Sequence, residues 1–150
     1  MKHKTLLLTF LSVAALTAGC DKRETTSQQL DKVQEKTEAA AQDLKEKDYT
    51  YAQKAEYTER MQGQLDDINR DLDQLAAKIE KSSDAVKAEA QPKLQSLREK
   101  AGKLNSHLDE VKNATESTWD SVKAGSKKAY EELKDGFNQA RQWVSDKLAP

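Results

Sequence analysis

Apolar residues recur at heptad spacing along the first half of the chain, beginning at Leu30. From Met61 to Ile79 nearly every a and d position is apolar, whereas lysines and a threonine weaken the repeat between residues 47 and 58. A sustained heptad is typical of a helix that turns one face toward a partner helix. The pattern therefore predicts a helix over residues 30–82.

A second heptad follows a short polar break. Ser82-Ser83-Asp84 are all good helix N-caps, so they predict a tight turn and a new helix over residues 84–116. Pro92 either kinks this helix or lies in the first turn of one that starts near Gln91. Two amphipathic helices joined by a short turn form an antiparallel hairpin. The a and d positions of the second helix are Leu94, Leu97, Ala101, Leu104, Leu108 and Val111.

The last part of the chain has a different repeat. Residues 118–150 divide into three eleven-residue units in which Gly125 and Gly136 occupy equal places. Eleven residues make three helical turns, so equal places stack along one face. We expect an amphipathic helix over residues 118–148. Its apolar stripe is Trp119, Val122, Tyr130, Leu133, Phe137, Ala140, Val144 and Leu148.

Two arrangements of this last helix are open. In the first, it continues the second helix, and a turn near residue 83 pairs Leu44 with Val122; the match of apolar with apolar positions favours this arrangement. In the second, the chain breaks near Ser117, and the last helix folds back or lies on a membrane. The predicted fold class is all-α in both cases: a long antiparallel helical hairpin (coiled coil) with an amphipathic C-terminal helix, continuous with the hairpin or folded onto it.

The N-terminal segment has the anatomy of a signal peptide. Lys2-His3-Lys4 form a basic start, and the apolar run that follows is too short to span a bilayer. The run ends in Leu16-Thr17-Ala18-Gly19-Cys20, which resembles the lipobox of bacterial lipoproteins. In that family the signal peptide is removed and the cysteine becomes the lipidated first residue. The resemblance implies removal of residues 1–19 and a covalent lipid on Cys20, which is the only cysteine in the sequence.

The lipobox and the repeats that follow it predict how the rest of the chain is organised. Residues 20–29 comprise the lipidated cysteine and a polar, flexible tether, and residues 30–150 form the helical coiled-coil domain. We expect a lipid anchor in the cell membrane that faces the periplasm. Asp21 resembles an inner-membrane retention signal that Lys22 weakens, so the choice between inner and outer membrane stays open.

Composition narrows the range of functions. Without residues 1–19 the chain has 23 basic and 26 acidic residues, which does not suit nucleic-acid binding. His107 is then the only histidine, and the carboxylates occur as solvated pairs on helices. We therefore expect no enzyme, no catalytic or metal-binding residues, no small-molecule substrate and no cofactor other than the lipid on Cys20.

The aromatic residues of the last helix have two interpretations. They fill the end of a helical core, or they form a face that meets lipid or a protein partner. In the continuous hairpin this face lies at the membrane end of the molecule, where residue 137 is beside residue 30. The candidate face consists of Trp119, Val122, Tyr130, Leu133, Phe137, Trp143 and Val144.

Two segments resemble a group of small bacterial coiled-coil proteins known as stress-response proteins. They are YAQKAEYTERMQGQLDDINRDLDQLAAKIE and ESTWDSVKAGSKKAYEELKDGF, and the resemblance covers about residues 45–137. The family implies no catalytic residues, cofactor or defined ligand. We therefore expect a non-enzymatic, membrane-anchored coiled-coil lipoprotein that acts through a protein partner or self-association in envelope maintenance or stress response. The alternatives are a lipid-surface-binding protein and a holdase-like periplasmic chaperone.

Overall fold

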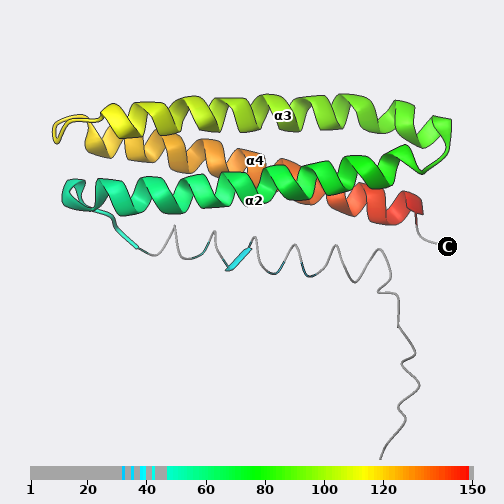
Figure 1. The fold of residues 1–150 in the computed structure, drawn as a ribbon, viewed down its shortest axis with the longest axis horizontal. Coiled ribbons are helices and arrows are strands. Elements are labelled where there is room, and N and C mark those ends of the chain that lie inside the picture. The colour runs from blue at the N-terminus through cyan, green and yellow to red at the C-terminus, as the bar shows by residue number, and fades with distance from the viewer. Residues whose placement is uncertain (1–31, 33–34, 36–37, 40–41, 43–46, 149–150) are drawn as a thin grey trace, which may run out of the picture.

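Three long helices packed side by side make up most of the described chain. The structure, a computed structural model, describes residues 32, 35, 38–39, 42 and 47–148. Within these residues it contains helices and loops but no strand. Consecutive helices run in opposite directions, so α2 and α4 point the same way (Figure 1). The elements are the 3₁₀ turn η1 (Tyr51–Gln53), α2 (Lys54–Glu80), α3 (Asp84–Asn113) and α4 (Trp119–Leu148).

The predicted heptad positions of α2 and α3 form much of the core. The clean part of the first repeat is buried at every a and d position from Met61 to Ile79, and the second repeat is buried from Leu97 to Val111. Each fully buried aliphatic side chain contributes about 1.5–3 kcal/mol. This part of the prediction is confirmed. The stripe of α4 completes the core with Trp119, Tyr130, Leu133, Phe137, Ala140 and Val144.

The prediction of one uninterrupted helix over residues 30–82 is wrong. Residues 47–50 are not helical, although residues 32, 35, 38, 39 and 42 on the N-terminal side are. Thr50 begins the next turn, because its backbone N–H donates to the Gln53 side-chain oxygen at 3.1 Å and the two residues form a capping box. The break lies within the weak part of the heptad. The predicted a and d positions Leu30, Val33, Thr37, Ala40 and Leu44 lie outside the described residues.

The predicted turn between α2 and α3 is present. Ser83 is the N-cap of α3, and its hydroxyl accepts a hydrogen bond from the Val86 N–H at 3.5 Å. The helix starts at Asp84 and runs through Pro92, so the interpretation that Pro92 lies in the first turn of a helix starting near Gln91 is wrong. Proline removes one backbone donor, but its ring is exposed and α3 continues as a helix on both sides of it.

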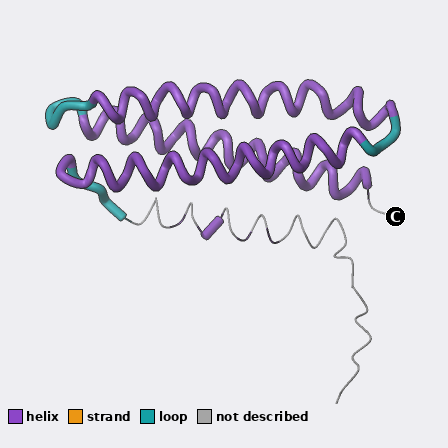
Figure 2. Tube along the Cα trace, viewed as in Figure 1, coloured by secondary structure: helices purple, strands orange, loops and turns teal. Residues whose placement is uncertain are grey.

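The favoured continuous arrangement of the last two helices is wrong, and the folded-back arrangement holds. The chain leaves the helix after Asn113, three residues before the predicted end, and α4 returns along α3; Figure 2 shows the two short connecting loops. The Thr115 N–H donates to the Thr118 hydroxyl at 3.0 Å, a local bond that competes with helical pairing. Across the new interface, the Lys147 ammonium lies 3.0 Å from a Glu89 carboxylate oxygen.

This topology also changes the predicted placement of the aromatic residues. Trp119 lies at the end where the chain enters α2, whereas Trp143 lies near Lys93, close to the start of α3. The helices are about 40–45 Å long at 1.5 Å per residue, so the two tryptophans are near opposite ends of the bundle. The aromatic residues therefore do not gather at one end, as the continuous hairpin required.

Candidate functional site

The first candidate site is an aromatic junction where the chain enters the bundle. We define it as Tyr49, Tyr51, Tyr57 and Trp119. The rings of Tyr49 and Tyr57 are 5.2 Å apart between centroids, and those of Tyr57 and Trp119 are 5.5 Å apart, both edge-to-face. Such pairs contribute about 0.5–1.5 kcal/mol beyond their burial. Tyr49 and Tyr57 have no exposed surface, so this end of the bundle is closed by large side chains.

Polar groups fasten the entering segment to α4. The Trp119 indole N–H donates to the Tyr49 carbonyl at 2.9 Å. The Lys123 ammonium donates to the same carbonyl at 2.9 Å and to an Asp48 carboxylate oxygen at 2.9 Å. These groups are 70 or more residues apart in sequence. The contacts therefore tie residues 48–49 to the first turns of α4.

A second polar contact lies beneath the rings. The Tyr57 hydroxyl and the buried Ser126 hydroxyl are 2.7 Å apart. Ser126 also donates to the Lys123 carbonyl at 2.9 Å. Ser126 thus gives the Tyr57 hydroxyl a partner in the interior, where an unpaired hydroxyl would be costly.

Burial and ion pairing shift the pKa values of titratable groups in and beside the junction. Burial raises the pKa of Tyr57 to about 12, despite its hydrogen bond to Ser126. Burial lowers the pKa of Lys123, but its bonds to Asp48 and Asp120 outweigh this effect and raise it overall. The bond from Lys123 holds the pKa of Asp48 below its usual value. At neutral pH Tyr57 is therefore protonated and Lys123 is charged, which suits a structural junction.

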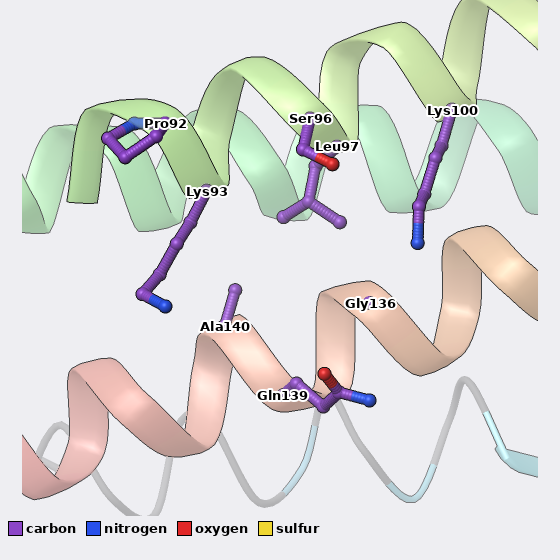
Figure 3. Close-up of a pocket in the computed structure, with 8 residues that line it drawn as sticks. All are labelled: Pro92, Lys93, Ser96, Leu97, Lys100, Gly136, Gln139 and Ala140. Atoms are coloured by element: carbon purple, nitrogen blue, oxygen red, sulfur yellow. The ribbon is translucent and has the colours of Figure 1, made fainter. Parts of the chain in front are cut away.

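The second candidate site is a pair of shallow grooves between α3 and α4, which we call the α3–α4 trough. The first groove has a volume of about 340 Å³ and the second about 260 Å³, and Lys100 lines both. Figure 3 shows the first groove, in which Lys93 and Lys100 extend from α3 toward α4 on either side of Leu97. The lining of the second groove is Lys100, Lys103, His107, Gly125, Lys128, Ala129 and Glu132.

The repeated glycines of α4 lie on this face, one in each groove. A Cβ atom at Gly136 would lie 3.1 Å from Leu97 Cδ2 and 3.2 Å from Lys100 Nζ, which is closer than ordinary contact. At Gly125 the nearest atoms, in the His107 ring, are 3.7 Å away. The eleven-residue repeat therefore serves close approach at Gly136, whereas a Cβ atom at Gly125 would make an ordinary van der Waals contact with His107.

Five of the seven residues predicted as a lipid or partner face lie in the core. Trp119, Tyr130, Leu133, Phe137 and Val144 are each at most 3% exposed. Val122 and Trp143 are partly buried and pack against the core. The structure thus brings these residues together as interior packing along α4. In this conformation they do not form an exposed face.

The prediction missed several buried residues, and it missed Lys123. Tyr49 and Tyr57 occupy neither a nor d positions of the first heptad, yet both are fully buried. Ser126 and Arg141 are buried on α4 at 0% and 3% exposure. Helical spacing contained this signal, because Ser126 lies four residues from Val122 and four from Tyr130. Lys123 had no comparable signal, because its partners are distant in sequence.

No described helix combines the length and the apolar character that a membrane span requires. Among the described residues, no group of three or more His, Cys, Asp or Glu side chains is arranged to hold a metal ion. No protein family matches the chain, and comparisons with curated proteins and with solved structures find no match either. The resemblance to stress-response proteins therefore stays a prediction. Cys20 and residues 1–31 lie outside the described residues.

Proposed function

We propose that this protein is a non-enzymatic lipoprotein of the bacterial cell envelope that acts by binding. One observation carries the proposal: Leu16-Thr17-Ala18-Gly19-Cys20 follows a short apolar run and contains the only cysteine. The lipid on Cys20 inserts into the membrane and holds the protein on its periplasmic side. A protein partner or a second copy then meets the helical bundle, in envelope maintenance or stress response.

The described bundle supports this division between anchor and fold. The aromatic junction fastens residues 48–49 to α4, so the segment on the Cys20 side joins a well-packed end. Among the described residues, the buried apolar side chains lie in α2, α3 and α4 and at Tyr49 and Ala114, and they form one core. The anchor therefore places the bundle, and the bundle provides the binding surface.

The test compares the natural chain with Cys20→Ser in bacterial cells. We expect the natural chain to lose residues 1–19, to gain the mass of a lipid modification and to fractionate with membranes. Cys20→Ser should lose the modification and the membrane association while keeping its helical circular dichroism. An unmodified Cys20 in the natural chain would contradict the anchor, and an unfolded variant would contradict its independence from the fold.

A second candidate is binding to a lipid surface through α4 itself. It rests on the apolar stripe from Trp119 to Leu148, which runs the full length of the helix. Because this stripe is buried, lipid binding of this kind requires α4 to separate from α2 and α3. Vesicles should then shift the fluorescence of buried Trp119. An unchanged Trp119 signal in the presence of bound vesicles would exclude this candidate.

A further inference from the structure

We propose that the α3–α4 trough is a docking surface for the phosphate groups of an anionic bilayer. The proposal rests on the lipid anchor of the proposed function, which places the bundle next to a membrane. It adds an orientation, because the bundle then lies with its α3–α4 face on the bilayer instead of projecting from its tether. Unlike the opening of α4, it leaves the core intact.

Charge is the first argument for this surface. Lys93, Lys100, Lys103 and Lys128 line the two grooves, and Glu132 is the only acidic side chain among the lining residues. This excess of basic groups contrasts with the chain as a whole, whose net charge is −1. Lysines near an anionic membrane surface attract its headgroups over roughly one Debye length.

Two carboxylates on α3 near the lining residues have partners of their own. Glu110 lies 3.0 Å from the His107 ring nitrogen, and Glu89 lies 3.0 Å from the Lys147 ammonium. These contacts reduce the competition between the carboxylates and a phosphate for the four lysines.

The donor set of the first groove is the second argument. Lys93 and Lys100 provide ammonium groups, Ser96 a hydroxyl and Gln139 an amide, and no carboxylate lines this groove. One donor of Lys100 is used by the Glu132 carbonyl at 3.2 Å, which leaves the others available. Charge-assisted bonds of this type are the strong ones for phosphate oxygens. A volume of about 340 Å³ admits a headgroup phosphate.

The position of Trp143 is the third argument. Its half-buried ring lies between two lysines, with Lys93 Nζ at 5.4 Å and Lys147 Nζ at 5.8 Å from the centroid. Tryptophan flanked by lysine is typical of side chains at the headgroup level of a bilayer. Trp143 thus extends the same surface toward the end of α4.

The experiment uses the chain without residues 1–19 and with Cys20→Ser, so that no lipid anchor contributes. Flotation measures its partition onto vesicles of phosphatidylglycerol and phosphatidylcholine, with pure phosphatidylcholine as the neutral surface. We expect binding to the anionic vesicles only, and its loss in high salt. The trough variant Lys93→Glu/Lys100→Glu/Lys103→Glu should bind at least tenfold more weakly.

The control variant carries the same change in charge away from the trough: Arg70→Glu/Lys81→Glu/Lys112→Glu. These exposed groups line neither groove, so we expect less than a threefold loss. Equal losses in both variants would overturn the proposal, because binding would then follow net charge alone. Thermal melts of both variants confirm that the bundle is folded.

Further outcomes distinguish a failure of the docking surface from a failure of the proposed lipid anchor. If inorganic phosphate perturbs the Lys93 and Lys100 resonances while vesicles do not bind, the trough takes free phosphate and the membrane proposal fails. If vesicles do not bind but Cys20 is lipidated in cells, the docking surface fails while the anchor stands. An unmodified Cys20 would remove the anchor itself, whatever the vesicles show.

Discussion

The aromatic junction and the α3–α4 trough both involve α4, but different kinds of side chain build them. At the junction, bulky rings close the end of the bundle and polar groups bridge segments 70 or more residues apart. At the trough, two glycines and two alanines bring the helices close and leave shallow grooves under lysines. The comparison teaches that one end of α4 holds the fold through buried contacts, whereas the grooves beside α3 are open and are the surface for which we propose binding.

The strongest test of this difference is a matched pair of tryptophan truncations. Trp119→Ala should lower the free energy of unfolding by about 3–5 kcal/mol, because it empties a buried ring site and removes the donor to the Tyr49 carbonyl. Trp143→Ala should cost about 1–2 kcal/mol, since that ring is only partly buried. Denaturant unfolding measures both. Equal losses would show that the two ends of the bundle are equally committed to the fold.

Alkaline pH should lower the free energy of unfolding through two buried tyrosines. Burial raises the pKa values of Tyr57 and Tyr130 to about 12, whereas an unfolded tyrosine loses its proton near pH 10. Their contribution is therefore complete below pH 10 and is lost as the pH rises toward 12, by about 1 kcal/mol per tyrosine for each pH unit. Unfolding curves between pH 9 and 12 test this.

The control for the alkaline loss is Tyr57→Phe/Tyr130→Phe. This variant starts at a lower stability, because it loses hydrogen bonds to Ser126 and Gln64. Its stability should fall less steeply above pH 10, since neither phenylalanine titrates. A slope as steep as that of the natural chain would assign the alkaline loss to other groups, such as Lys123.

A pair of lysine substitutions compares the polar contacts of the two regions. Lys123→Met should lower stability by about 1–2 kcal/mol, because it removes hydrogen bonds to Asp48 and to the Tyr49 carbonyl. Lys100→Met in the trough should cost less than about 0.5 kcal/mol, since its hydrogen bond to the Glu132 carbonyl is exposed. Thermal or urea unfolding distinguishes them, and a larger effect at Lys100 would make the trough a structural region instead of a binding surface.

The smallest expected effects concern the glycines. Gly102→Ala should raise stability by about 0.5–1 kcal/mol, because alanine favours the helix and nothing lies within 4 Å of its added Cβ. Gly136→Ala should show no gain or a loss, because its Cβ would press on Leu97 at 3.1 Å. An equal gain at both positions would mean that the helices do not require close approach at Gly136.

The sequence contained enough information for most of the buried helical positions but not for the break at residues 47–50 or for the arrangement of the helices. Apolar spacing identified the buried positions of α2 and α3, and the eleven-residue repeat identified most of the buried stripe of α4, because burial follows local periodicity. Residue pairing along the chain favoured a continuous hairpin. A short loop decided otherwise, since the local bonds of Thr115 and Thr118 interrupt the helix and allow α4 to fold back.

The two candidate sites depend on tertiary contacts that no local pattern contains. Lys123 meets Asp48 across 75 residues, and the trough combines three lysines of α3 with one lysine and two glycines of α4. The sequence of α4 alone is nearly neutral and predicts no basic face. The lipid on Cys20, the tether and the signal peptide concern residues outside the described part of the chain, so they stay predictions.

The opposed positions of the two tryptophans have a spectroscopic consequence. The chain has only these two indoles, and each reports on a different environment: Trp119 on a buried, hydrogen-bonded interior, and Trp143 on a partly exposed site between ammonium groups. Replacing one with phenylalanine leaves a single intrinsic fluorophore. Quenching by iodide would then follow local opening at one end of the bundle independently of the other, without any added label.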